Sequence, residues 1–387
     1  MHIPSQIEYM LRKLSSCGYE AYLVGGCVRD YLLGKTPNDY DITTSALPDE
    51  TMDVFAGDRV IPTGIKHGTV TVLYDGVAAE ITTYRTETTY TDGRHPDKVE
   101  FSLSISDDLC RRDFTVNAMA MDIDSNIVDL YGGRADLEKK VIRTVGNPKE
   151  RFTEDALRIL RAFRFASKLG FEIEENTLSA AVSLADRLSL VSRERIFDEL
   201  MKLICGMHAG KIVRLMYENK IFDCIFDIPV INEAALAYFD RMPSFENARF
   251  AALLLYDERI CEHVKSLKTS SEFAMSVKKI VECHLPDAYD KPTLRRIISK
   301  YGHAALDRCI AEGNSSGLGN MIFELIDTEN CFSVSDLDIS GNDIMAMGKQ
   351  GKDIGKTLNE LLFAVFDEKV ANNRKDLIEY IKKVDNT

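Results

Sequence analysis

The sequence changes its pattern near residue 150. Before that point, short runs of β-branched residues alternate with Gly and Asp turns, and Asp75-Gly76 separates two such runs as in a tight hairpin. From about Thr153 onward, apolar residues recur at spacings of three and four, which is typical of helices. We therefore predict an α+β head with a mixed or antiparallel sheet, followed by an all-α remainder.

Net charge sets a second constraint on the kind of partner. The chain of 387 residues carries 48 Lys and Arg against 61 Asp and Glu, a formal charge of −13. Phosphate contacts need basic residues, so this balance favours a small-molecule enzyme over a nucleic-acid binder. The acidity is uneven, however, and Lys278-Lys279, Arg295-Arg296, Arg374-Lys375 and Lys382-Lys383 are candidates for a local basic strip.

Apolar runs and cysteine spacing indicate the cellular compartment in which we expect the protein. The longest apolar run, Phe250 to Tyr256, is far shorter than the ~20 residues of a membrane span. The nine cysteines never form a C-x-x-C pair and are scattered along the chain. We expect a reduced, cytoplasmic protein without a membrane segment. The sequence leaves the oligomeric state open.

A strand-to-helix turn at Gly25-Gly26 is a candidate phosphate site. Backbone amides at a helix start bind phosphate well when no Cβ blocks them, and Arg29 lies one turn further on. The alternative is a plain turn, because the dinucleotide pattern G-x-G-x-x-G is absent. Cys27 is expected to be a packing residue.

Paired carboxylates at Asp39 and Asp41 are a candidate metal site. Residues two apart on a strand share a face, so we expect these two side chains to lie together. Oxygen-only ligands suit Mg²⁺, and such pairs hold two metals in nucleotidyl transfer. A D-x-D pattern occurs three times here, but only this one follows the Gly-Gly turn. Glu80, between Ala79 and Ile81, lies either at an exposed edge or beside the metals.

Arginines supply the remaining candidates in the head. A polar stretch, Arg85 to Asp97, lacks apolar periodicity and is expected to be a loop. It precedes Arg111 and Arg112, which could take a triphosphate. The alternative is that both form surface ion pairs with Asp107 and Asp108.

A predicted helix from Thr153 to Gly170 carries charge on one face. Its charged residues on that face are Glu154, Asp155, Arg158, Arg161 and Arg164. One interpretation is a salt-bridged surface helix, since Asp155 and Arg158 are three apart. The other is base recognition: an Asp that accepts from an exocyclic amine, with an Arg that donates to the ring nitrogen, selects C and A and rejects U and G.

Four motifs in this order resemble the class II tRNA nucleotidyltransferase and poly(A) polymerase family. They are Val24-Gly-Gly-x-Val-Arg-Asp-x-Leu-Leu-Gly, Asp39-x-Asp41, Arg111-Arg-Asp-Phe-Thr-x-Asn-Ala and Glu154-Asp-x-x-Arg-x-x-Arg-x-x-Arg164. The resemblance implies a polymerase-β-like nucleotidyltransferase head (1–150), a helical neck (151–215), a body (216–330) and a tail that binds the tRNA elbow (331–387).

The resemblance also implies the roles of single residues. Asp39 and Asp41 would hold two Mg²⁺ ions, and Asp155 and Arg158 would read the base. The phosphates or sugar of the incoming CTP or ATP would contact Gly26, Arg29, Arg112, Arg161 and Arg164. The 3′-hydroxyl at the tRNA acceptor end would attack the α-phosphate and release pyrophosphate.

Family members add CCA, only CC, only A, or poly(A). Members that add only CC resemble the rest but lack part of the loop that follows the metal strands, whereas Tyr84 to Val99 is full-length here. We predict CCA addition, with A-only or poly(A) addition as the alternative. A catalytically silent RNA-binding relative is disfavoured by the intact Asp39, Asp41 and Arg112. A small-molecule nucleotidyltransferase is disfavoured by the long helical arm.

Overall fold

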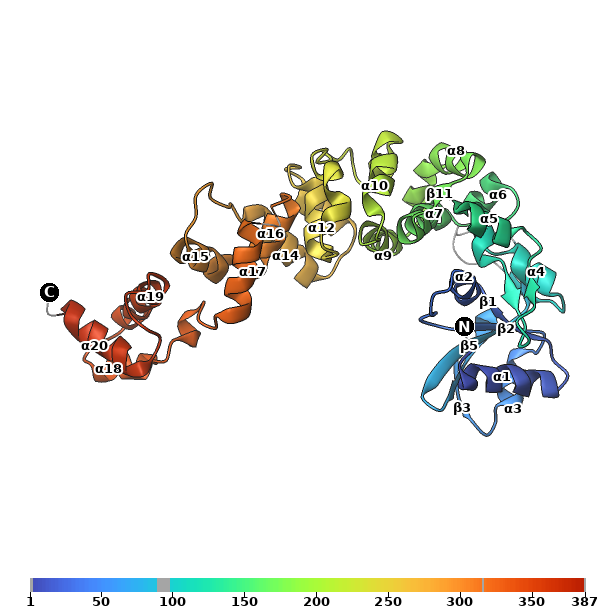
Figure 1. Cartoon of the computed structure of the whole chain (residues 1–387), viewed down its shortest axis with the longest axis horizontal. Helices are drawn as coiled ribbons and strands as arrows, with labels where there is room; N and C mark the ends of the chain where they lie inside the picture. Colours follow the sequence, from blue (N-terminus) through green and yellow to red (C-terminus); the bar gives the residue numbers. More distant parts are fainter. Residues whose placement is uncertain (1–2, 89–97, 315–316, 386–387) are drawn as a thin grey trace. The chain divides into compact units, whose positions relative to one another are not determined.

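A computed structural model describes residues 3–88, 98–314 and 317–385 of the chain (Figure 1). These residues form two compact units, 1–227 and 228–387. The described part of the first unit contains the sheets and a set of helices, and that of the second is helical. The boundaries predicted at residues 150, 215 and 330 stay a prediction.

A mixed seven-stranded sheet lies at the centre of the first unit. Its strand order is β3-β4-β5-β2-β1-β8-β9, in which β2 and β5 run parallel and the other neighbours antiparallel. The predicted α+β head is therefore confirmed. The strands are β1 (Ala21–Val24), β2 (Asp41–Thr44), β3 (Arg59–Gly64), β4 (Thr69–Tyr74), β5 (Val77–Thr83), β8 (Ala120–Met121) and β9 (Ile127–Val128).

The hairpin predicted at Asp75-Gly76 joins β4 and β5. Both turn residues have a positive φ, 45° for Asp75 and 79° for Gly76, as the tight mirror-image turn requires. The pairing starts at once, with Tyr74 opposite Val77. The Asp-Gly signal therefore predicted both the place and the kind of turn.

A separate two-stranded sheet replaces part of the predicted polar loop. β6 (Arg85–Thr88) pairs antiparallel with β7 (Lys98–Phe101). The loop prediction was wrong for β6, because backbone pairing with a neighbouring strand needs no apolar periodicity. The rest of that loop, 89–97, lies outside the described residues, as does the middle of the segment Tyr84 to Val99 used to argue against CC-only addition.

Helix α1 (Ser5–Ser16) packs on the sheet through one apolar face. Ile7, Met10, Leu11 and Leu14 recur at helical spacing and are all fully buried. The helix contacts β1, β5 and α3 (Pro48–Val54), and Figure 1 shows α1 and α3 beside the strands.

The charged helix predicted from Thr153 to Gly170 is two helices. α6 (Pro148–Glu154) ends just before Asp155, whose backbone is extended with φ −138° and ψ 106°. The Asp155 carboxylate accepts a hydrogen bond from the Leu157 amide at 3.0 Å, which starts α7 (Leu157–Leu169). The single-helix prediction was therefore wrong at its first turn. The predicted end is confirmed, since Gly170 is left-handed with φ 73°.

The first unit contains further helices and two short strands. They are α2 (Gly26–Leu32), α4 (Ile105–Cys110), α5 (Gly133–Lys139), α8 (Glu175–Ser183), α9 (Arg193–Ile204), α10 (Ala209–Glu218), α11 (Ile221–Ile225), β10 (Val141–Ile142), β11 (Glu172–Ile173), η1 (Ile65–His67), η2 (Thr115–Asn117) and η3 (Ala185–Leu190). α7 packs closely on α9, which brings the charged residues of both helices together.

The second unit consists of helices packed around apolar side chains. They are α12 (Glu246–Leu254), α13 (Ile260–Ser266), α14 (Ser271–Glu282), α15 (Lys291–Tyr301), α16 (Ala304–Ala311), α17 (Leu318–Thr328), α18 (Gly341–Ala346), α19 (Lys352–Phe366), α20 (Arg374–Asp385), η4 (Ala235–Ala237), η5 (Phe239–Arg241) and η6 (Val334–Asp336). Among the described residues, no helix in either unit has the length and apolar character needed to cross a bilayer.

Arg295 connects α15 to the end of α19. It is 8% exposed, forms ion pairs with Glu329 at 2.7 Å and Glu368 at 3.0 Å, and donates to the Phe366 carbonyl. The neighbouring Arg296 pairs with Asp367. The prediction that this arginine pair lines a basic strip was therefore wrong, because the two side chains are neutralised in structural contacts.

Candidate active site

The predicted carboxylates lie at and just before the start of β2. Asp41 begins the strand and lies directly opposite Glu80 of the parallel strand β5, so their side chains share a face of the sheet. Asp39 lies two residues earlier, in a bend before the strand. The expectation that Asp39 and Asp41 share one strand was therefore wrong, because Asp39 lies before the strand begins.

Electrostatics connect these carboxylates to one another. The pKa of Asp41 is raised to about 6, first by loss of hydration and then by the charges of Asp39 and Glu80. Arg112 opposes this shift and favours the ionised form. A carboxylate that is repelled by two neighbouring carboxylates lies where a bound cation would be stabilising.

The donor set suits a hard divalent cation. Within the described residues, no three Asp, Glu, His or Cys side chains are arranged to hold a metal ion by themselves. Mg²⁺ commonly takes only one or two protein carboxylates and completes its shell with water and substrate phosphates. The Asp39 and Asp41 carboxylates meet that requirement, and Glu80 is placed to support it.

The Gly25-Gly26 turn lies against Arg112. Gly25 has φ 78° and ψ −128°, a conformation that other residues avoid, and a Cβ there would lie 3.0 Å from Nη1 of Arg112. Gly26 begins α2, where an added Cβ would make only ordinary contact with Arg29 at 3.6 Å. Gly25 is therefore the position where glycine is structurally required. Cys27 is buried and its pKa is raised to about 11 by burial, as expected of a packing residue.

Arg111 and Arg112 share one buried partner. Asp108 is fully buried and accepts from Arg111 at 2.6 Å and from Arg112 at 3.0 Å. Burial alone would raise its pKa, but the two arginines outweigh burial and hold that pKa below its usual value. The alternative of ion pairing is thus borne out for Asp108, in a buried setting. The arrangement fixes both guanidinium groups, and such fixing is compatible with a role in phosphate binding.

A chain of hydrogen bonds connects Arg29 to α7. Arg29 is 3% exposed and donates to the side-chain oxygen of Asn117 at 2.6 Å. The Asn117 amide donates to Asp113, whose other oxygen accepts from Arg161 at 2.5 and 2.9 Å. Burial of Asp113 opposes its ionisation, but Arg161 holds its pKa below the usual range. The network therefore fixes both guanidinium groups in place.

Glu199 of α9 lies beside two arginines of α7, Arg161 and Arg164. Its carboxylate lies 2.8 Å from Nε of Arg164 and 3.8 Å from Nη1 of Arg161. Only 5% of Glu199 is exposed, so this carboxylate is a buried counter-charge for the pair.

The predicted base-reading residues do not pair with each other. Asp155 accepts from Arg195 of α9 at 2.8 Å. Arg158 donates to Glu154 at 2.5 Å and to the Arg111 carbonyl at 3.2 Å, and only 8% of it is exposed. The alternative of a salt-bridged surface helix is therefore confirmed in its ion pairing, through Glu154 with Arg151 and Arg158, but it was wrong about the partner of Arg158 and about its exposure. Both side chains are instead held by separate partners, at the break between α6 and α7.

Several network residues were missing from the predicted site. Asp113 and Asn117 lie within the quoted Arg111-to-Ala118 motif, which was the signal available for them. Arg195 and Glu199 come some forty residues after their partners, on another helix, and no local pattern marks them. Their role depends on how α9 packs against α7.

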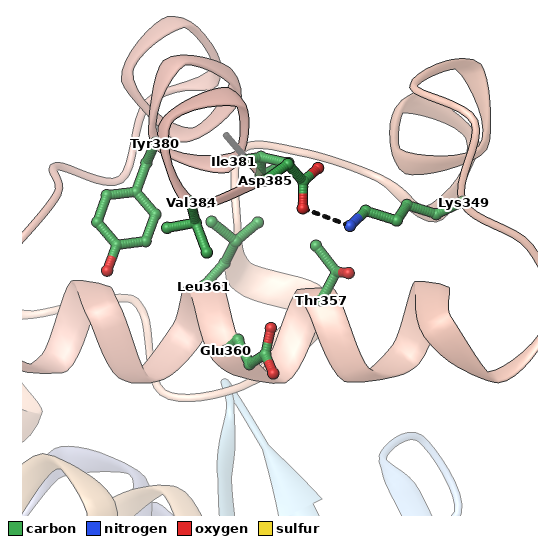
Figure 2. A pocket seen from close by; sticks show the side chains of 8 residues that line it. All are labelled: Lys349, Thr357, Glu360, Leu361, Tyr380, Ile381, Val384 and Asp385. Carbon is green, nitrogen blue, oxygen red and sulfur yellow. Dashed lines mark hydrogen bonds and ion pairs between the residues drawn. The ribbon is translucent and has the colours of Figure 1, made fainter. Parts of the chain in front are cut away.

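A hollow in the second unit contains none of the predicted site residues. It lies between α19 and α20, with Leu361 and Tyr380 among its walls and an ion pair between Lys349 and Asp385 at one side (Figure 2). Because its walls mix apolar and charged side chains without a cluster of carboxylates, it is not a second candidate for the catalytic centre.

Known proteins match this chain along most of its length. Family models match residues 21–143 (Poly A polymerase head domain), 170–234 (RNA and SrmB-binding site of polymerase A) and 246–381 (tRNA nucleotidyltransferase domain 2). The CCA-adding enzyme of Streptococcus mutans is 35% identical over 400 residues, which cover 99% of this chain and 98% of that enzyme. The chain belongs to the CCA-adding enzyme family. The recognition from the four motifs is thereby confirmed.

Other CCA-adding enzymes extend this result. That of Streptococcus suis is 37% identical over 399 residues, covering 99% of this chain and 98% of the relative. The crystal structure of the Bacillus stearothermophilus CCA-adding enzyme in complex with CTP is 30% identical, covers both chains completely and has a TM-score of 0.83. The Thermotoga maritima CCA-adding enzyme complexed with tRNA_CCA is 20% identical with a TM-score of 0.72, and shares the fold.

Proposed function

We propose that this chain adds CCA to the 3′ end of tRNA from CTP and ATP, without a nucleic-acid template. The observation that carries the proposal is the strand register that places Asp41 opposite Glu80, where the charges of Asp39, Glu80 and Arg112 all act on the Asp41 carboxylate. Family membership supports the same reaction, and the solved relatives include complexes with CTP, ATP and tRNA_CCA.

Asp39 and Asp41 are the proposed ligands of two Mg²⁺ ions, with Glu80 as a supporting carboxylate. Nucleotidyltransferases of this kind normally need a divalent metal, and the oxygen donors here favour Mg²⁺. When bound, the ions would lower the pKa of the attacking 3′-hydroxyl and neutralise charge that develops on the α-phosphate. Arg112 favours the ionised form of Asp41, against the effects of burial and of the Asp39 and Glu80 charges.

Four arginines are the proposed contacts to the triphosphate or sugar of the nucleotide. Arg29, Arg112, Arg161 and Arg164 each have a buried or half-buried carboxylate or amide partner, which fixes the guanidinium group before the nucleotide arrives. Fixed donors lose little conformational entropy on binding an anion. The amide of Gly26, at the start of α2, is the proposed backbone contact.

Asp155 and Arg158 are the proposed readers of the base. Asp155 accepts from the exocyclic amine that cytosine and adenine share, and Arg158 donates to the neighbouring ring nitrogen. Arg195 holds the Asp155 carboxylate, while Glu154 and the Arg111 carbonyl hold Arg158. Uracil and guanine present a carbonyl where the amine is needed, so Asp155 repels them.

The helical region after residue 150 is the proposed tRNA-binding part. We assign 151–215 as the neck, 216–330 as the body and 331–387 as the tail that contacts the tRNA elbow. Lys375 and Lys382 of α20 are exposed, as a phosphate-binding surface needs. The net charge of −13 is compatible with this assignment if the tRNA follows local basic positions.

One assay tests the whole proposal. Transcripts of tRNA that end before, within or after CCA are incubated with CTP and ATP, separately and together, and their 3′ ends are sequenced. We expect CTP alone to add two C residues, ATP to add one A only after CC, and growth to stop at CCA. Addition of A alone, or of a long A tract, would instead establish the A-adding or poly(A) alternative. No incorporation would indicate a catalytically silent RNA-binding relative.

A further inference from the structure

The aromatic ring of Phe165 lies among three of the proposed phosphate-binding arginines. Its centroid is 4.1 Å from Cζ of Arg164 and 5.4 Å from Cζ of both Arg29 and Arg161. These distances are within the range of cation–π attraction. Arg161, Arg164 and Phe165 come from α7, whereas Arg29 comes from α2, so one ring contacts cations from two separate elements.

Three guanidinium groups this close repel one another. The pKa of Arg164 is lowered by burial first, and the positive charges of Arg161 and Arg29 lower it further, against the opposing charges of Glu199 and Asp113. Added carboxylates would reduce the repulsion, but they would also repel an incoming triphosphate. The negative face of an aromatic ring attracts cations while it carries no net charge. Phe165 therefore stabilises the close approach of the three guanidinium groups without reducing their positive charge.

The ring itself is fixed in place. Only 6% of Phe165 is exposed, and its ring meets that of the fully buried Phe114 edge to face, at a centroid distance of 5.6 Å and an angle of 76°. Phe114 follows Asp113, the carboxylate that binds Arg161. A ring held in this way defines where the guanidinium groups can lie.

We infer that Phe165 is a positioning residue for nucleotide binding, which holds Arg29, Arg161 and Arg164 in a preformed arrangement for the triphosphate. The inference rests on the proposed function, because it takes these arginines to be the phosphate contacts. It implies that loss of the ring weakens the binding of CTP and ATP equally, since the two nucleotides share the triphosphate. It also implies that the choice between bases is unchanged.

Phe165→Leu tests the inference against a matched control on the same helix. Phe163 is fully buried, and none of the cation–π contacts among the described residues involves it, so Phe163→Leu removes a ring of the same size without this role. Phe165→Tyr keeps the ring, and Phe165→Met replaces it with a flexible side chain that fills similar space. For each folded variant, KM and kcat are measured for CTP and ATP, with the inhibition constant of tripolyphosphate and the melting temperature.

We expect Phe165→Leu and Phe165→Met to raise both nucleotide KM values and the tripolyphosphate inhibition constant by about five- to tenfold. The KM for tRNA and the rejection of UTP should stay unchanged, and Phe165→Tyr should restore nucleotide KM values close to wild type. Phe163→Leu should lower the melting temperature without raising KM.

Nucleotide KM values of Phe165→Leu and Phe165→Met at the wild-type level would overturn the inference, as would equal increases in Phe163→Leu. If Phe165→Leu does not fold, the comparison of nucleotide KM values between Phe165→Met and Phe165→Tyr tests the inference instead. Failure of the proposed function has a different signature, namely a wild-type protein that incorporates neither nucleotide.

Discussion

Gly25 gives a direct test of how the turn before α2 positions Arg112. Gly25→Ala must adopt φ 78° and ψ −128°, which costs a residue with a Cβ about 1–3 kcal/mol. The new Cβ would also lie 3.0 Å from Nη1 of Arg112, closer than ordinary packing allows. Because the guanidinium is the far end of a flexible side chain, we expect it to move by a few tenths of an ångström while the backbone stays.

This displacement should reduce catalysis more than stability explains. A misplacement of 1 Å in an active site can cost about 10²-fold in rate, so a few tenths of an ångström should cost about tenfold in kcat. The assay is steady-state CTP incorporation into tRNA that lacks CCA, with urea unfolding of the same preparations. A fall in stability of about 1–3 kcal/mol should accompany the loss of activity.

Gly34→Ala is the matched control for backbone strain. Gly34 also has a positive φ, 70°, but no atom lies within 4 Å of the position of an added Cβ. This variant should lose about 1 kcal/mol of stability and keep its activity. If Gly25→Ala keeps wild-type kcat and loses only as much stability as Gly34→Ala, contact with Arg112 has no role in catalysis and the reasoning is refuted.

Three further predictions concern the carboxylates, the base-reading pair and the α15 arginine. Asp41→Ala should abolish incorporation and leave tRNA affinity within about twofold in filter binding; incorporation at the wild-type rate would contradict the metal assignment. Asp155→Ala and Arg158→Ala should each reduce the rejection of UTP and GTP by about 10- to 100-fold in competition assays, and unchanged rejection would exclude base reading by this pair. Arg295→Met should lower the free energy of unfolding by about 1–3 kcal/mol, a range that already allows for the partial exposure of the partner Glu329. An unchanged free energy of unfolding would show that these ion pairs are energetically neutral.

Local signals in the sequence predicted the parts of the fold that depend on nearby residues. The Asp75-Gly76 hairpin and the end of α7 at Gly170 follow from turn chemistry within a few residues. The order of the motifs predicted the family, which the relatives confirm. The assigned roles of the site residues stay predictions.

The features that the sequence did not predict depend on contacts between residues far apart in the chain. The charged periodicity continues through Asp155, so nothing local indicates that the chain extends there and that Arg195 binds the carboxylate. The same holds for Arg295, which looks like half of an exposed basic pair until Glu329 and the Phe366 carbonyl are brought to it. In both cases the partner lies more than thirty residues away in the sequence.

The parallel pairing of β2 with β5 restricts where this chain tolerates insertions. Asp41 and Glu80 face the same side because they are direct partners in the β2–β5 pairing, while the two-residue turn at Asp75-Gly76 sets the register of β5 against its other neighbour, β4. One extra residue between that turn and Glu80 would turn the glutamate to the opposite face and bring an apolar neighbour beside Asp41. Length changes should therefore be absent from this segment in active homologues, whereas the connection from α3 to β3 is free of that constraint.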